Sequence, residues 1–392
     1  MKGMAHKDLI SPNHKLRNGY YPAIINQTVS HLLANGVGFS KPEIKNKMGV
    51  NFDGVLRKIA TDAKNSGVSY GFYNGNKVIH FPFLEFKAIP DDRTGAISAG
   101  VRFTQIDENK PLIAVLYESD GYTEYTRYKN DFEITKQKTA YIINNISNSV
   151  EGVYSVHDGN FSQLPIYPLY NVSHQSEIIG VREILTAIDM VNSQLVNNVS
   201  QGELVYWVLK NYGGMDDIED ANFIVNLLKS HVIHVDDGDA TPHQITTPFE
   251  ANDTAAVRLK RLLFESMGAV DTETLRAGNL TATAINAAFH DMRLNSANME
   301  YEVIEFIQGI LRIAGLPENT ALSFTYFETV NETEAIQNAI ASATFIGDEA
   351  ATRKICEILG IADNFENIQK QKISESLERF SEDYGGNKNE KQ

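Results

Sequence analysis

The chain has 392 residues, 42% of them hydrophobic and 22% charged, which is enough for a sizeable core and two or three domains. Its formal net charge of −15 argues against a simple DNA-binding surface, which would carry a basic patch, but leaves open DNA that slides past without being gripped. Cys356 is the single cysteine, so no intramolecular disulfide can form, and no signal peptide or membrane span is expected.

The first 170 residues predict two helices followed by a strand-rich lobe. Apolar residues at helical spacing predict helices over 20–39 and 52–66, with Gly67 as the residue that ends the second. From 68 to about 170 the hydrophobic period changes to two, and Asn74-Gly75 and Asp120-Gly121 are typical of hairpin turns. We expect antiparallel strands here, with aromatic residues packed in the core and across strands.

An out-and-back pair of helices follows, with an acidic lobe at its tip. The helical period runs over 175–210 and returns over 252–268. Between them we expect a short helix over 220–229, a strand over 231–235, a turn at 236–239 and a second strand within 242–249 that can pair back. Residues 213–253 contain nine acids against one base, Lys229; the acids are Asp216, Asp217, Glu219, Asp220, Asp236, Asp237, Asp239, Glu250 and Asp253.

The last third of the chain is mainly helical. A polar loop over 269–282 leads into a long helix over 283–314, which Gly315 and Pro317 end. A strand over 322–329 and a series of shorter helices complete the chain, and the final residues are expected to be disordered.

Motifs for the common enzyme classes are missing. The sequence has no phosphate-binding loop, no dinucleotide fingerprint, no zinc-protease motif and no serine-hydrolase elbow. The turn Asp236-Asp237-Gly238-Asp239 could bind a hard cation, but Gln244 stands where a calcium loop needs its glutamate. His231 and His234 would point to opposite faces of a strand. We therefore expect no catalytic residue, no metal and no cofactor; the alternative is a hydrolase or metal-dependent enzyme using residues 236–239.

The polar loop after the second helix is the other candidate site. It is either a plain connector or a mobile segment that touches a moving partner, and Gly278 gives it conformational freedom. Its candidate functional residues are Asp271, Thr272, Glu273, Thr274, Arg276 and Asn279.

The order of these parts resembles one family, the portal proteins of tailed phages, in the branch typified by the SPP1 portal. The resemblance rests on the opening helix YYPAIINQTVSHLLANGVGF, the strand segment KVIHFPFLEFKAIPDDRTGAISAGVRF, the returning helix ANDTAAVRLKRLLFESMGAV and the loop-to-helix segment LRAGNLTATAINAAF. Each motif is weak alone, and their shared order over about 20–385 is the specific part.

The resemblance implies an α+β portal fold with named segments. These are a wing of helices and antiparallel strands (1–173), a stem helix (174–212), a small α/β clip (213–249), a returning stem helix (250–268), a tunnel loop (269–282), a spine helix (283–314), a wing strand (315–330), and a helical crown with a disordered tail (331–392).

It also implies a function. The family forms a ring, typically of twelve subunits, at one capsid vertex of the virion, assembled in the host cytoplasm. Double-stranded DNA is packaged through its axis by the terminase large subunit and later ejected; the other implied partners are the major capsid and scaffold proteins and a head-completion adaptor. An acidic clip fits such a conduit, because like charge repels the DNA backbone instead of trapping it. A different virion ring, such as an adaptor, is a further alternative.

Overall fold

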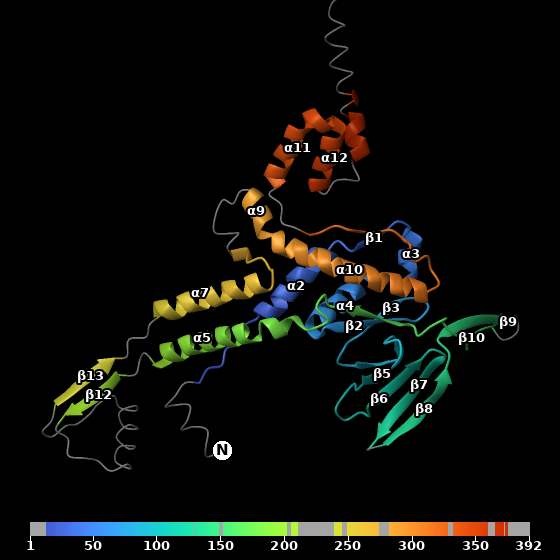
Figure 1. Cartoon of the computed structure of the whole chain (residues 1–392), viewed down its shortest axis with the longest axis horizontal. Coiled ribbons are helices and arrows are strands. Elements are labelled where there is room, and N and C mark those ends of the chain that lie inside the picture. The colour runs from blue at the N-terminus through green and yellow to red at the C-terminus, as the bar shows by residue number, and fades with distance from the viewer. Residues whose placement is uncertain are drawn as a thin grey trace, which may run out of the picture.

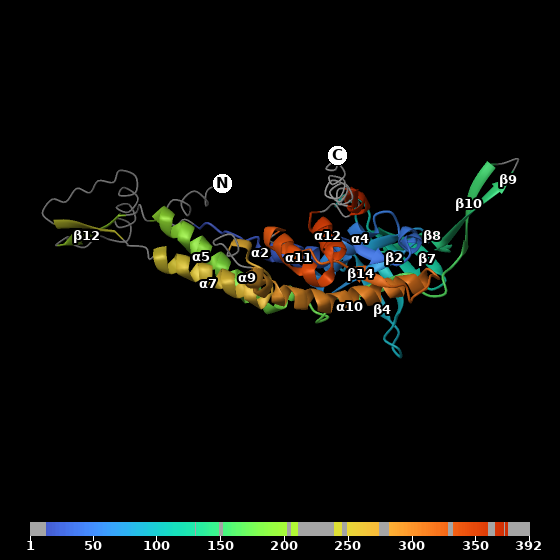
Figure 2. The ribbon, with the colours of Figure 1, turned by 90° about the horizontal axis from the view of Figure 1, so that it is seen from above.

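The computed structural model describes residues 13–129, 131–148, 152–201, 205–210, 239–244, 249–273, 282–327, 332–359, 365–371 and 373–374. The subunit is elongated and thin (Figures 1 and 2). A two-stranded hairpin of β12 (Val205–Lys210) and β13 (Asp239–Gln244) lies at one end. A second hairpin, of β9 (Ile142–Asn148) and β10 (Gly152–Gly159), lies at the other.

Helices form the stem, the centre and the top of the subunit. Their bounds are α2 (Tyr20–Leu33), α3 (Pro42–Lys47), α4 (Phe52–Ser66), the 3-10 helix η1 (Glu177–Gly180), α5 (Arg182–Gln201), α7 (Phe249–Ser266), α9 (Ala282–Ala288), α10 (His290–Ile313), α11 (Glu332–Ile346) and α12 (Asp348–Ile358). Among the residues described, no helix is both long enough and apolar enough to span a bilayer.

All strand pairs of the described residues are antiparallel. The remaining strands are β1 (Val37–Phe39), β2 (Val68–Tyr73), β3 (Val78–Phe81), β4 (Phe86–Pro90), β5 (Ile97–Thr104), β6 (Ile113–Glu118), β7 (Gly121–Tyr128), β8 (Asp131–Thr139), β11 (Ile166–Tyr170) and β14 (Leu322–Phe324). They form a five-stranded meander β4-β5-β6-β7-β8, a three-stranded sheet β11-β2-β3 and the pair β1-β14. The predicted strand lobe over 68–170 is therefore confirmed.

The main core lies between the three-stranded sheet and helices α2, α4 and α10. Close approach of α10 to the sheet depends on two glycines that leave room for aromatic rings. A Cβ at Gly71 of β2 would lie 2.5 Å from Cζ of Phe306, and one at Gly309 of α10 would lie 2.5 Å from Cε1 of Tyr167. Phe306 is fully buried as a result. The helix and the sheet are thus locked together by ring-to-backbone contacts.

A second core joins the opposite face of the three-stranded sheet to the five-stranded meander. It consists of aromatic and aliphatic side chains: Tyr70, Phe81, Phe86, Tyr117, Tyr141, Leu164 and Ile166. Tyr70 and Phe86 meet edge to face with ring centroids 4.7 Å apart, the geometry that aromatic pairs prefer. The buried aromatic residues of this lobe are packing residues, as the sequence predicts.

The stem consists of α5 and α7 side by side, leading from the core to the β12-β13 hairpin (Figure 1). Val181 and Ile188 of the first arm and Leu263 and Met267 of the second belong to the main core. The apolar stripes at the base of the stem therefore pack inside the subunit.

Several predicted boundaries are wrong. The strand expected over 322–329 is shorter and ends at Phe324. The helix expected over 175–210 ends at Gln201 and continues as β12, because the run VYWVLK is rich in β-branched and aromatic residues that favour strands. The helix expected over 20–39 ends at Leu33, and Val37–Phe39 pairs instead with β14, almost 300 residues further along the chain. The helix expected over 283–314 is interrupted at Phe289, whose buried ring packs with Val270 and Met292.

Local stop signals are confirmed. Gly67 follows α4 with φ of 88° and ψ of −25°, in the left-handed region, and Gly315 follows α10 with a φ of 66°. Two helices of the tail, α11 and α12, also appear where the sequence predicts helices. The helix expected over 220–229 and the strand expected over 231–235 lie outside the described residues.

Candidate functional site

The candidate loop begins where α7 ends, and the end of this helix is tightly defined. Gly268 adopts a φ of 55°, its N–H donates to the carbonyl of Glu265 at 3.2 Å, and the N–H of Ala269 donates to the carbonyl of Phe264 at 2.9 Å. This pair of bonds is a Schellman motif, which satisfies the last carbonyls of a helix and turns the chain sharply away. The direction in which the loop leaves the stem is therefore fixed by backbone bonds.

Two amide side chains, from α2 and α10, hold the backbone on either side of Gly268. The side chain of Gln27 on α2 donates to the carbonyl of Val270 at 2.9 Å and accepts from its N–H at 3.3 Å. Asn295 on α10 donates to the carbonyl of Met267 at 3.2 Å. Val270 itself is buried with Phe289 and Met292. The start of the loop is thus anchored to the core from two sides.

Lys260 on α7 neutralises the first two acids of the loop. Its Nζ lies 3.1 Å from the Asp271 carboxylate and also bonds the Glu273 carboxylate. The ammonium group lies 5.9 Å from the ring centroids of both Tyr20 and Phe264, within the range of a cation–π contact. Lys260 and Asp271 are each 19% exposed, whereas Glu273 is 80% exposed. The inner carboxylate is a structural anchor, and the outer one is open to solvent.

The environment of Lys260 also favours its charged form. Partial burial acts to lower the pKa of Lys260, but the hydrogen bonds that it donates to Glu273 and Asp271 outweigh burial and raise this pKa above its usual value. Lys260 is therefore a permanent cation at neutral pH, and the start of the loop carries less net negative charge than its acids suggest.

Only part of the predicted loop site can be placed. Asp271, Thr272 and Glu273 are described, and the structure brings the two acids together on Lys260. Thr274, Arg276 and Asn279 lie outside the described residues. Sequence reasoning missed Gln27, Lys260 and Asn295. Lys260 had one usable signal: Leu263 and Phe264, three and four residues further on, place it beside the apolar face of its helix, where an unpaired cation would be unfavourable.

The acidic clip residues lie almost entirely beyond the described parts. Asp216, Asp217, Glu219, Asp220, Asp236 and Asp237 are outside them. Asp239 is the first residue of β13, opposite Lys210, the last residue of β12, and Gln244 pairs with Val205 at the other end of the ladder. The strand expected within 242–249 thus runs over Asp239–Gln244 and pairs with the end of the outgoing arm.

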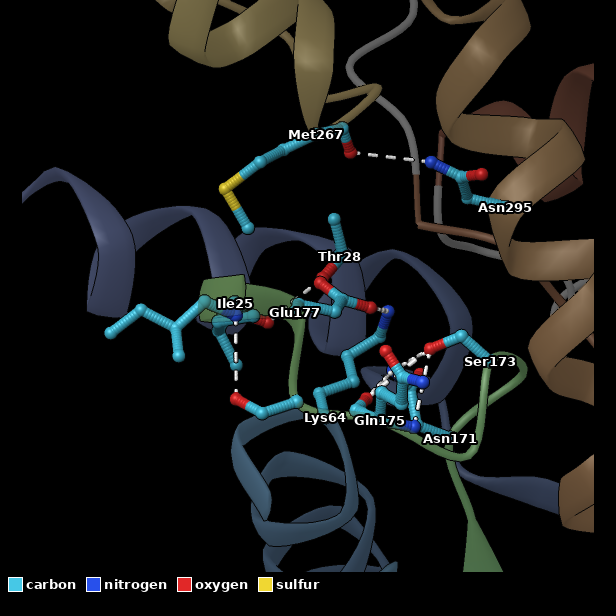
Figure 3. A network of polar contacts seen from close by, with 11 residues as sticks. Ile25, Thr28, Lys64, Asn171, Ser173, Gln175, Glu177, Met267 and Asn295 are labelled. Atoms are coloured by element: carbon cyan, nitrogen blue, oxygen red, sulfur yellow. Dashed lines mark hydrogen bonds and ion pairs between the residues drawn. The ribbon is translucent and has the colours of Figure 1, made fainter. Parts of the chain in front are cut away.

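A polar network fixes the point where the outgoing stem arm leaves the core (Figure 3). Lys64 of α4, which is almost fully buried, lies 2.5 Å from Glu177 of η1. The buried side chain of Asn171 donates to the carbonyl of Gln175 at 2.8 Å and so holds the connecting loop. A buried ion pair with good geometry is costly to break, so this junction is stiff. Both arms of the stem therefore start from anchored points.

The described residues contain no cluster of three or more histidine, cysteine, aspartate or glutamate side chains that could hold a metal ion. The contacts described above are anchors between elements: an amide clamp, a Lys–carboxylate cluster and a buried ion pair. Such contacts position a loop and a stem, and they supply no nucleophile paired with a base.

The described parts comprise a pair of long helices with a hairpin at their far end, a loop anchored at their base, and a strand-rich lobe on the opposite side. The family described as "Phage portal protein, SPP1 Gp6-like" matches residues 4–377, and the chain belongs to this family. The protein has a portal function, and the family is structural rather than enzymatic. The match gives no support to the hydrolase alternative.

Individual relatives are distant. The portal protein of Clostridium phage phiCD119 is 22% identical, over 95% of this chain and 90% of the relative. Among solved structures, a chain of the virion of a native gene transfer agent particle is 9% identical, with a TM-score of 0.45 and 83% of each chain covered. A chain of the neck of the native particle, computed with C12 symmetry, is 10% identical, with a TM-score of 0.42 over 86% of this chain and 87% of the other.

Proposed function

We propose that copies of this chain close into a ring of twelve subunits at a capsid vertex, with double-stranded DNA passing through the axis. The terminase large subunit drives packaging, and a head-completion adaptor then docks to the ring. The capsid and scaffold proteins surround the ring during assembly, which takes place in the host cytoplasm. The observation that carries the proposal is the family match over residues 4–377.

The segment assignments form part of the proposal. The α5–α7 pair serves as the stem, the β12-β13 hairpin as the base of the clip, α9 and α10 as the spine, and α11 with α12 as the crown. Support comes from the order of these elements along the chain and from the elongated subunit, in which the hairpin and the strand-rich wing lie at opposite ends (Figure 1).

The charge of the clip supports a conduit that does not bind its cargo tightly. Residues 213–249 carry seven acids and a single base, Lys229. A protein that neutralises about 6–10 phosphates binds DNA in a strongly salt-dependent way, which would stall translocation. Twelve copies of an acidic clip repel the phosphate backbone instead. The anchored start of the tunnel loop also fits this function. Because the loop starts from a fixed point, the position along the channel axis at which it would meet the DNA is defined.

Electron microscopy of the purified protein tests the proposal. Rings with an axial hole are the expected particles, and a mass near twelve times that of one chain should accompany them. A monodisperse monomer at every protein and salt concentration would contradict the proposal. An acidic-cluster enzyme predicts instead a measurable turnover that Ala substitutions of Asp236, Asp237 and Asp239 abolish.

A further inference from the structure

A line of residues, all exposed except the half-buried Glu302, runs along α10 on the side facing away from the core. The α10 stripe consists of Asp291, Leu294, Asn298, Tyr301 and Glu302, at the spacing that places residues on one helix face. Leu294 is 56% exposed and Tyr301 is 72% exposed, although both are large and apolar or aromatic. The stripe therefore has an apolar centre with a carboxylate at each end.

An open groove of about 550 Å³ runs along the outer side of α4. The α4 groove is lined by Asn26, Gly54, Arg57, Lys58, Thr61, Asp62, Asn65 and His80. Two exposed aliphatic residues lie near the lining residues in the chain. Val50 precedes α4 and is fully exposed, and Leu84, 90% exposed, follows Phe83, whose N–H donates to Asp62. The groove thus carries two cations, Arg57 and Lys58, beside Asp62 and His80, which contact each other.

The charges of these two surfaces lack partners within the subunit. Among the described residues, neither Arg57 nor Lys58 forms an ion pair with a carboxylate, and Arg57 donates only to the hydroxyl of Ser30. Asp291 and Glu302 also form no ion pair there. Partial burial and then the nearby Glu305 raise the pKa of Glu302, and the nearby His174 only partly offsets them, so a further cation from outside the chain would stabilise its charged form.

The two surfaces lie on different helices of one layer. Both helices cover the same face of the β11-β2-β3 sheet: α10 contacts β11 and β2, and α4 contacts β2 and β3. In Figure 2, α10 runs along one long edge of the thin subunit, and α4 lies further toward the opposite edge. From Asp291 to Glu302 and from Gly54 to Asn65, each surface spans about 16 Å at the rise of a helix. The surfaces match in length as well as in charge.

We propose that the α10 stripe of one subunit docks into the α4 groove of the next, so that this pair of faces forms the repeating head-to-tail contact of the ring. Rings require two different, complementary faces whose rotation closes. Asp291 and Glu302 meet Arg57 and Lys58 of the neighbour, and the exposed apolar side chains at both surfaces are covered. This inference rests on the proposed ring and names the contact that builds it.

Charge reversal in both directions tests the contact. One variant carries Arg57→Glu with Lys58→Glu, and the other carries Asp291→Lys with Glu302→Lys. Each alone should reduce the fraction of subunits in rings at least tenfold by mass photometry, because like charges then face each other. An equimolar mixture of the two should recover rings, as should one chain carrying all four changes. The control Lys87→Glu with Lys110→Glu has the same charge change on exposed wing residues and should assemble normally.

Cross-linking of the wild-type protein gives an independent reading that does not depend on any variant folding. A carbodiimide that joins amines to carboxylates should link Lys58 to Asp291 or Glu302 of another subunit. The proposed contact would be wrong if both charge-reversal variants formed rings on their own. It would also be wrong if mixing the two variants restored no rings and wild-type rings gave no such cross-link. Neither result would contradict the ring itself. A wild-type protein that forms no rings would instead contradict the proposed function itself.

Discussion

At the scale of single residues, Lys260 is the contact that most clearly ties the loop to the stem. Replacing it with Met keeps most of the aliphatic stem but leaves the largely buried Asp271 carboxylate without its cation. We expect Lys260→Met to lower the free energy of unfolding by about 1–2 kcal/mol, measured by denaturant unfolding at fixed protein concentration.

The neighbouring Arg261 provides a matched control. Its ion pair with Glu265 involves side chains that are 78% and 58% exposed, and exposed pairs contribute about 0–1 kcal/mol. Arg261→Met should therefore change stability much less. The folded pKa of Lys260 is raised, so its contribution is complete below the unfolded value of 10.5 and declines as the pH rises through the folded value. Equal effects of the two substitutions at pH 7 would argue against Lys260 as an anchor.

At the scale of elements, the contact between α10 and the three-stranded sheet depends on Gly309. In an isolated helix, replacing Gly with Ala stabilises by about 1 kcal/mol. Here the new Cβ would lie 2.5 Å from Cε1 of Tyr167, so the ring must move out of a packed site. We expect Gly309→Ala to destabilise the protein by about 1–3 kcal/mol in denaturant unfolding.

Gly180→Ala is the control for this substitution, because a Cβ at Gly180 would meet nothing within 4 Å. It should leave the unfolding midpoint nearly unchanged. If Gly309→Ala raised the midpoint, Tyr167 would be free to move, and the close approach of helix and sheet would not be a requirement of the fold.

The sequence predicts correctly the elements that depend on neighbouring residues, and it misses those that depend on residues far apart in the chain. The helix stops at Gly67 and Gly315 depend on local backbone conformation, so a glycine suffices to predict them. The pairing of β1 with β14 and the clamp of Gln27 on Val270, 243 residues apart, depend on tertiary contacts that no local pattern records. After α5 ends at Gln201, the apolar run of β12 is short, and in so short a run helix and strand periods are hard to separate. Acids and bases of the loop could be predicted as candidates, but not their pairing with Lys260.

At the scale of the whole molecule, the proposed function depends most on where the clip lies in the assembled ring. A cryo-electron microscopy map of the ring measures this directly. We expect the hairpin of β12 and β13, with the acidic residues between them, to line the narrow end of an axial channel wide enough for double-stranded DNA. A map with this hairpin on the outer rim, away from any channel, would contradict the claim.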